Sequence, residues 1–165
     1  MNILLVAATA YEIAPTLTLL EQTFALNERN GAFEKNELSV KTLITGVGAT
    51  ASAWHLSQHL AHTPVDWVLH AGVAGAYDRS LELGTVVQIT RERFGDLGVQ
   101  EADGRFTDVF ELGLVQANTP PFLNGQLHNP GAEQTPFLPA VNGLTVNRVH
   151  GQSEAIAAIQ AKYPD

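Results

Sequence analysis

The carboxylate of Glu12 is the first side chain whose place in the sequence suggests chemistry. Thr9-Ala10-Tyr11-Glu12 follows an apolar run and precedes an amphipathic stripe, so Thr9 and Glu12 have the spacing of a capping box. The junction between a strand and a helix also lies at the carboxyl edge of a sheet, where open α/β folds gather ligands. Two roles therefore stay open for Glu12, which either caps a helix or activates a water molecule.

Two glycine-rich segments could also bring the backbone close to a ligand. Gly46-Val47-Gly48-Ala49-Thr50-Ala51 matches the G-x-G-x-x-G/A pattern that cradles pyrophosphate in dinucleotide folds. In dinucleotide folds this pattern follows the first strand, but here it follows the second predicted strand. Such folds also place an acidic residue after a strand, whereas Asp66, the nearest candidate, precedes one. The pattern therefore argues against a nicotinamide cofactor. Ala71-Gly72-Val73-Ala74-Gly75-Ala76 indicates close approach by a ligand or by a packed helix.

Three histidines fall on one face of a predicted helix, at spacings of four and three: His55, His59 and His62. Two of them could share a metal ion, but no Glu completes an H-E-x-x-H pattern. A solvated or partly packed histidine face is the favoured interpretation, and no metal site is predicted. The chain has no cysteine, and no serine sits in a G-x-S-x-G elbow, so the sequence offers neither a thiolate nor a serine nucleophile.

Alternating strand and helix patterns must position these residues. The apolar run Ile3 to Ala8 predicts a strand covered on both faces, and a stripe of apolar residues predicts a helix from about Ala10. Further strands are expected at residues 38–44, 67–71, 85–90 and 143–149. Helices are expected at residues 49–62 and 153–163, and Ser153 is expected to cap the second of these. The first four strands should form one sheet. Prolines break the pattern between Arg91 and Asn142, a length of chain that is usually functional or mobile.

Composition narrows the class of protein and its partners. The 165 residues are 45% hydrophobic and 16% charged, which favours one domain over residues 1–165. A net charge of -8 without a basic block argues against nucleic acid as a partner. No apolar run approaches the roughly 20 residues that span a bilayer, and the apolar start lacks a positive n-region. We therefore expect a soluble, cytoplasmic protein with no membrane partner.

Several segments, taken in order, resemble the nucleoside phosphorylase and nucleosidase superfamily. They are Glu12 after the first strand, Ile44-Thr45-Gly46-Val47-Gly48, the stretch from Leu69 to Gly75 and the stretch from Leu83 to Val87. Three others resemble futalosine hydrolase more than its methylthioadenosine nucleosidase relatives: Phe94-Gly95-Asp96-Leu97-Gly98, Phe110 to Leu114, and Gly143 to Asn147.

This resemblance implies a fold and a reaction. The implied fold is of the α/β class, with three α/β/α layers around a central mixed sheet, and is phosphorylase/hydrolase-like. The reaction is hydrolysis of the N-glycosidic bond of a purine nucleoside, without metal or organic cofactor. Within the superfamily, the implied reaction releases hypoxanthine from futalosine in menaquinone biosynthesis. A methylthioadenosine/S-adenosylhomocysteine-type nucleosidase and a nucleoside phosphorylase stay open as alternatives. A homo-oligomer is also implied, in which the phenylalanines between Phe94 and Phe122 meet a partner or pack back onto their own sheet.

The resemblance also assigns site residues. Glu12 matches the water-activating glutamate, and Val73, Ala74 and Gly75 match a small loop beside ribose and water. Val149 and His150 fall near the segment whose backbone lines the purine. The predicted substrate-binding set is completed by Ala8, Gly48 and Phe94.

One departure from the relatives concerns the carboxyl end. After a helix like that of residues 153–163, the relatives continue with a Met-Glu pair for the ribose and a later strand that carries the leaving-group partner. We therefore expect a truncated domain that lacks its last strands and helices. A second hypothesis of a different class follows, namely a non-catalytic fragment that at most binds purine.

Overall fold

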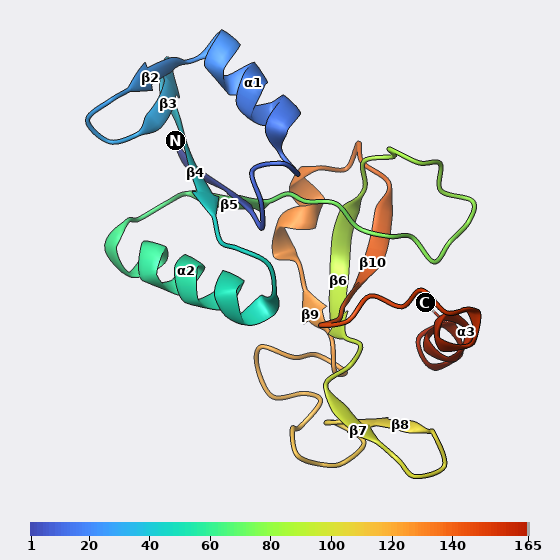
Figure 1. Ribbon diagram of the computed structural model, residues 1–165. Helices are drawn as coiled ribbons and strands as arrows, with labels where there is room; N and C mark the ends of the chain where they lie inside the picture. The colour runs from blue at the N-terminus through green and yellow to red at the C-terminus, as the bar shows by residue number, and fades with distance from the viewer. Residues whose placement is uncertain (165) are drawn as a thin grey trace. The chain divides into compact units, whose positions relative to one another are not determined.

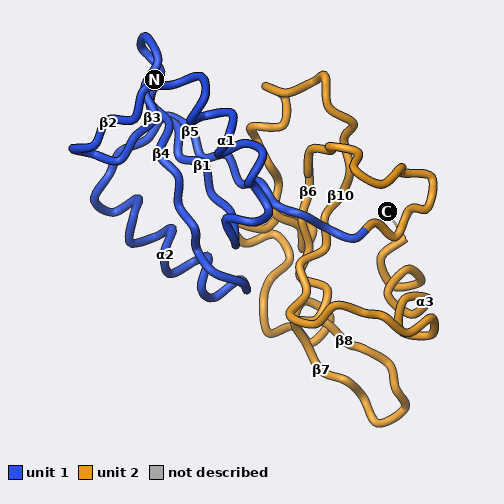
Figure 2. Tube along the Cα trace, turned by 45° about the horizontal axis from the view of Figure 1, so that its top comes forward, with its two compact units in different colours: residues 1–75 blue, residues 76–165 orange. Residues whose placement is uncertain are grey.

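The computed structural model describes residues 1–164 of the chain. The chain divides into two compact units, Met1–Gly75 and the remaining residues from Ala76 onward (Figure 2).

The first unit is built on a five-stranded mixed sheet with the order β2-β3-β4-β1-β5 (Figure 1). Its strands are β1 (Asn2–Ala7), β2 (Ala25–Asn27), β3 (Ala32–Lys35), β4 (Leu38–Ile44) and β5 (Trp67–His70). Its helices are α1 (Ala14–Thr23) and α2 (Ala49–His62). Central strand β1 runs parallel to both β4 and β5, whereas β2 and β3 extend the sheet by antiparallel pairing.

Strand β1 is covered on both faces, as its unbroken apolar run predicts. Leu5 and Ala7 point to one face, where they form a core cluster with Ile13 and Leu20 from the α1 region. Leu4 and Val6 point to the opposite face and are 0% and 2% exposed. The buried centre of the sheet therefore fixes the point from which the next residues, beginning at Ala8, leave the strand.

The parallel pairing gathers three loops at one edge of this sheet. Strands β1, β4 and β5 all end there, so the segments that follow them lie close together. Hydrogen bonds continue past the strand ends: Gly46 N donates to Ala8 O at 3.0 Å, and Ala71 N donates to Val6 O at 2.9 Å. The loops that contain most of the predicted site residues therefore start from a rigid edge.

The second unit contains a three-stranded sheet with the order β10-β6-β9. Strands β6 (Gln88–Phe94) and β10 (Ala140–Thr145) are parallel, and β9 (Leu127–His128) is antiparallel to β6. The other elements are the hairpin strands β7 (Gly98–Gln100) and β8 (Phe106–Asp108), the 3₁₀ helix η1 (Pro130–Gln134) and helix α3 (Ser153–Lys162). No helix in residues 1–164 is long and apolar enough to cross a membrane.

The predicted elements are confirmed in part and corrected in part. Strand β4 and helix α2 have the predicted bounds. Helix α1 begins at Ala14 rather than near Ala10, because the intervening residues form a turn. The prediction that Ser153 caps the last helix is wrong, since the cap position is Gln152 and makes no side-chain hydrogen bond.

The strands of the second unit differ most from prediction. Strand β6 begins three residues later than the predicted residue 85 and continues through Arg91 to Phe94. Strand β10 covers Ala140–Thr145 instead of residues 143–149. The fourth predicted strand does not join the first three in one sheet, because both edges of β6 are occupied by β10 and β9.

Candidate active site

The side chain of Glu12 is held by a reciprocal set of hydrogen bonds with Thr9. Glu12 Oε2 accepts from Thr9 N at 2.8 Å and from Thr9 Oγ1 at 3.0 Å, and Glu12 N donates to Thr9 Oγ1 at 3.4 Å. This is the bonding pattern of a capping box, but it closes the turn before α1. The cap position of α1 is Ile13, which makes no side-chain cap bond. The pair therefore fixes the rotamer of Glu12 ahead of the helix.

The second oxygen of Glu12 reaches the segment that follows β5. Val73 N donates to Glu12 Oε1 at 3.3 Å, across 61 positions of sequence. Gly72 makes this approach feasible, because a Cβ at that position would lie 3.3 Å from the same oxygen. A side chain there would push against the carboxylate, which explains the small residue. The structure thus brings together Glu12 and Val73, two of the predicted site residues.

The surroundings of Glu12 favour its charged form. Burial raises the pKa of this carboxyl, but the hydrogen bonds from Thr9 and Val73 and the charge of His70 outweigh it and hold the pKa below its ordinary value of 4.5. The group is therefore an ionised carboxylate at neutral pH, which accepts hydrogen bonds and can take a proton from water.

Ala8 and Gly48 lie on the loops at the same edge of the sheet. The carbonyl of Ala8 accepts the hydrogen bond from Gly46 N described above. Gly48 has φ 102°, a backbone conformation that residues with a side chain rarely adopt, and it occupies the cap position of α2. Its carbonyl accepts from Ser52 N at 3.0 Å, which starts the helix. Ala74 and Gly75 follow Val73 on the exposed loop after β5.

The other predicted site residues belong to the second unit. Phe94 packs edge to face on Phe122, with ring centroids 6.4 Å apart, and Phe122 packs in the same way on Phe110 at 5.1 Å. These three rings therefore pack on one another. Val149 is 89% exposed, and His150 Nδ1 is enclosed and has no hydrogen-bond partner in the described part of the chain. The roles assigned to these residues stay predictions, as does the homo-oligomer.

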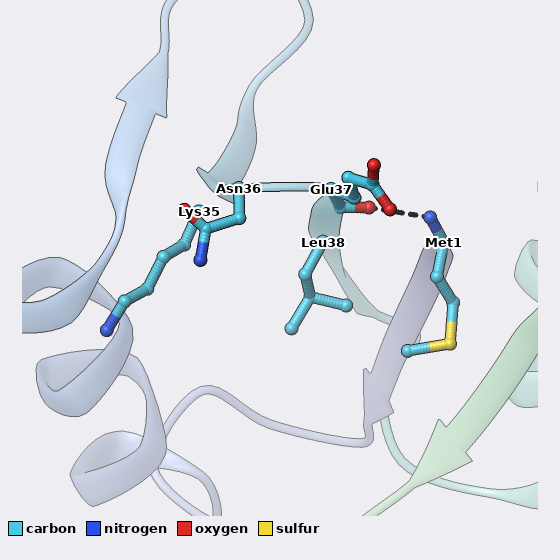
Figure 3. Close-up of a pocket in the computed structure, with 5 residues that line it drawn as sticks. All are labelled: Met1, Lys35, Asn36, Glu37 and Leu38. Atoms are coloured by element: carbon cyan, nitrogen blue, oxygen red, sulfur yellow. Dashed lines mark hydrogen bonds between the residues drawn. The ribbon is translucent and has the colours of Figure 1, made fainter.

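Two hollows in the first unit lie away from Glu12. One is lined by Met1, Lys35, Asn36, Glu37 and Leu38, and in it the amino group of Met1 donates to Glu37 O at 2.6 Å (Figure 3). The other includes Asn2 and Ile3. Both lie at the amino end of β1, whereas Glu12 follows its carboxyl end. A strand rises by about 3.3 Å per residue, so roughly 20 Å separates them. Neither hollow belongs to the candidate site.

The histidine face on α2 has no metal-binding geometry within the described residues. Residues 1–164 contain no group of three or more His, Cys, Asp or Glu side chains that could hold a metal ion. His59 is half-buried, with Nε2 enclosed and without a hydrogen-bond partner in that range, whereas His55 and His62 are exposed. This arrangement fits the partly packed face favoured by the sequence.

Sequence reasoning missed two features around the predicted residues. The first is His70, whose charge acts on Glu12 from the end of β5. The second is a contact between Asp96 and Asn147, in which the carboxylate accepts from both nitrogens of the asparagine. His70, Asp96 and Asn147 each lie inside a segment that carries the family resemblance, so the sequence marked these segments. Which of their residues come into contact depends on the order of the strands, which the sequence did not indicate.

The chain is similar to known proteins of one superfamily. Residues 2–146 match the phosphorylase superfamily. A 5'-methylthioadenosine/S-adenosylhomocysteine nucleosidase of Glaesserella parasuis is 31% identical over 135 residues, which cover 78% of this chain and 56% of that protein. The chain therefore spans little more than half the length of this curated relative.

Two solved structures have a similar fold. The crystal structure of a 5'-methylthioadenosine/S-adenosylhomocysteine nucleosidase from Neisseria meningitidis in complex with methylthio-immucillin-A has a TM-score of 0.69 at 19% identity, covering 99% of this chain and 72% of that one. A futalosine hydrolase mutant of Helicobacter pylori has a TM-score of 0.70 at 15% identity, covering 99% and 77%. These likenesses confirm the predicted fold class. The match over residues 2–146 shows that the chain belongs to the phosphorylase superfamily.

Proposed function

We propose that the protein hydrolyses the N-glycosidic bond of a purine nucleoside, with Glu12 as the general base. The observation that carries this proposal is the ionised carboxylate of Glu12, which Thr9 and Val73 hold at the carboxyl edge of parallel strands. Ligands of open α/β sheets bind at this edge. Membership of the phosphorylase superfamily supports the same class of reaction.

The two oxygens of Glu12 have different tasks in this reaction. Oε2 already accepts two hydrogen bonds from Thr9, whereas Oε1 accepts one longer bond of 3.3 Å from Val73 N. Oε1 therefore has the freer lone pair for a water molecule. As the purine departs, the sugar gains oxocarbenium character and water attacks its anomeric carbon. Oε1 takes the proton that this water releases, and the purine nitrogen that leaves the sugar gains a proton, so that the products are the free sugar and the free base.

Substrate binding should strengthen the base. A carboxylate with a lowered pKa is a weak base, and general bases work best when the pKa approaches the working pH. Burial is the largest single influence on the pKa of Glu12, and it acts upward. A bound nucleoside that excludes water increases this influence and brings the pKa closer to neutral.

Futalosine is the substrate that we propose first. The segments of residues 94–98, 110–114 and 143–147 resemble futalosine hydrolase, and a Helicobacter pylori futalosine hydrolase shares the fold. The 31% identity with the Glaesserella parasuis protein favours a second candidate, methylthioadenosine or S-adenosylhomocysteine. In both cases the reaction uses water and the proposal requires no metal or organic cofactor.

A direct assay separates these candidates. The purified chain, shown to be folded by circular dichroism, is incubated with futalosine, methylthioadenosine or S-adenosylhomocysteine, with and without phosphate, while the free base is measured. The Glaesserella parasuis nucleosidase serves as positive control for the second and third substrates. We expect release of hypoxanthine from futalosine without phosphate.

Other results of this base-release assay would favour a different activity. Release of adenine alone favours the second candidate, and a requirement for phosphate identifies a phosphorylase. A folded chain that releases no base from any of the three substrates overturns the proposed hydrolysis. Calorimetric titration with hypoxanthine and adenine then tests the remaining hypothesis, a non-catalytic chain that binds purine.

A further inference from the structure

The parallel strands β6 and β10 interlock through small residues that face large ones. A Cβ on Gly95 would lie 2.7 to 2.9 Å from three side-chain atoms of Leu144. A Cβ on Gly143 would collide with the carboxylate of Glu92, which also accepts a hydrogen bond from Thr145 Oγ1 at 2.9 Å. The segments of residues 94–98 and 143–147, noted separately in the sequence, are therefore partners across this strand pair.

The pairing continues past the end of both strands. Gly95 N donates to Thr145 O at 2.8 Å. The next residue, the half-buried Asp96, accepts with its carboxylate from Asn147 N at 2.6 Å and from Asn147 Nδ2 at 3.1 Å. Both carboxylate oxygens thus bind one residue, with backbone and side chain engaged together. Such charge-assisted, two-point contacts restrict orientation as well as distance.

This contact anchors the segment that leads to the predicted purine-binding residues. Val149 and His150 follow Asn147 by two and three positions, before α3 begins at Ser153. In the described part of the chain, the side-chain and loop hydrogen bonds made by residues 146–151 are those of Asn147 alone. Asp96 therefore accepts the hydrogen bonds that hold this segment ahead of α3.

We infer that Asp96 is a positioning residue that acts through Asn147 to set the purine-binding conformation of Val149 and His150. The inference rests on the proposed function and on the family resemblance, which predicts that Val149 and His150 lie near the purine. Asp96 itself does not contact the nucleoside. Its loss should weaken the binding of the purine base.

A charge exchange at the two positions tests this. Asn147→Asp places a second carboxylate against Asp96, and the repulsion should release the segment. Adding Asp96→Asn restores two hydrogen bonds, because an amide at position 96 can accept from the backbone nitrogen of residue 147 and donate to its new carboxylate. Gln116→Glu, on an exposed loop of the same unit, is the matched control for the added negative charge.

The primary readout is the Kd of hypoxanthine and of adenine, measured by calorimetric titration of the full 165-residue chain. We expect N147D to bind purine about tenfold more weakly, which corresponds to about 1.4 kcal/mol. The D96N/N147D double variant and Q116E should bind like the wild type. Thermal unfolding followed by circular dichroism checks that each variant is folded. Should N147D fail to fold, Asn147→Ala removes the 3.1 Å bond alone and should weaken binding to a smaller extent.

The outcomes separate this inference from the proposed function. If the wild-type chain releases no base from any nucleoside, the proposed function is overturned. If it releases base but binds neither purine, this inference alone is overturned. If the wild type binds purine and N147D binds it equally well, only the role of Asp96 is overturned. If the double variant stays as weak as N147D, the new charge at position 147 is itself the cause, and the positioning role is again wrong.

Discussion

Glu12 Oε1 lies 3.3 Å from the backbone nitrogen of Val73, so a turn after the first strand meets a loop after the fifth. The contact follows from strand order. Strands β1 and β5 are parallel neighbours in which Val6 pairs with His70, and the segments that leave them must emerge side by side. A carboxylate held in this way is already oriented before any ligand arrives, which is the preorganisation that a general base requires.

Replacement of Glu12 tests its chemical role. Glu12→Gln keeps the shape and the contact with Val73 but removes the group that takes the proton. We expect kcat to fall by a factor on the order of 10² to 10⁴, the usual contribution of general base catalysis. The rate of base release from the preferred nucleoside is the measurement, and Glu21→Gln on the exposed side of α1 is the control. Nearly full turnover by E12Q would return Glu12 to a purely structural role.

The pKa of Glu12 should appear in an acid titration. Since it lies below 4.5 in the folded chain, the base loses its charge only below that pH, and the acid limb of kcat/KM lies there. The same shift affects stability. A carboxyl with a lowered folded pKa stabilises the fold above its unfolded pKa, and this contribution is lost as the pH falls through the folded pKa.

The substitution Thr9→Val tests what lowers the pKa of Glu12. The substitution removes the hydroxyl hydrogen bond, the largest of the influences that lower the pKa of Glu12, and leaves the backbone bond in place. The pKa should rise toward 4.5. Carboxyl carbon NMR of labelled protein measures it without a need for turnover, and Thr18→Val on α1 is the control. An unchanged titration in T9V would show that the hydroxyl contributes nothing to the charge of Glu12.

The sequence predicts β1, β4, β5 and α2 because their signals are local, whereas it does not predict the short strands β2 and β3. The apolar run that became β1 has no alternation, and α2 contains neither glycine nor proline, so both elements can be inferred from their own residues. The second half of strand β6 could not be inferred in this way. Arg91, Glu92 and Arg93 carry no apolar pattern, yet they are strand residues because β10 and β9 pair with them on both edges. Strand preference is set by such partners.

The candidate site shows the same division. Glu12 and Val73 were each predicted from a short pattern, but their contact depends on β1 and β5 being neighbours, which no local pattern encodes. The contact between Asp96 and Asn147 spans 51 positions and depends on β6 pairing with β10. Local sequence patterns therefore identify candidate functional residues, but they do not identify which of these residues are in contact.

Lys162 should stabilise the second unit through several contacts at once. Its Nζ lies 2.6 Å from Glu111 Oε2, 3.6 Å from Asp108 Oδ2 and 3.2 Å from Phe106 O, and the side chain is 19% exposed. Lys162→Met keeps most of the apolar stem and removes the charge. We expect a loss of about 1 kcal/mol in the free energy of unfolding, measured with urea. Arg79→Met at an exposed position should leave stability unchanged.

Acid should reduce the difference between K162M and the wild type. The hydrogen bond from Lys162 is the largest cause that lowers the pKa of Glu111, so the ion pair stabilises the fold above the unfolded pKa of that carboxyl. Its contribution disappears as the pH falls through the folded pKa. A deficit in K162M that stays constant down to that pH would show that lost packing, rather than the ion pair, causes it.

Gly95 should tolerate no side chain while Leu144 is present. Gly95 is buried, and a Cβ there would come within 2.7 to 2.9 Å of Leu144. Gly95→Ala therefore overpacks the contact between β6 and β10, and we expect a loss of about 1 to 3 kcal/mol in the free energy of unfolding. Gly151→Ala is the matched control, because a Cβ there meets no atom within 4 Å.

Leu144→Ala completes a double-mutant cycle with this variant. The truncation costs stability by itself, since it removes packed side-chain atoms from β10. In its background, however, Gly95→Ala has lost the atoms with which its Cβ collides, so the cost of the added methyl group should largely vanish. The coupling energy from urea unfolding of the four proteins measures this directly, and residues in contact typically show values of about 0.5 to 3 kcal/mol. Additive costs would mean that the approach of Leu144 is not the reason why position 95 requires glycine.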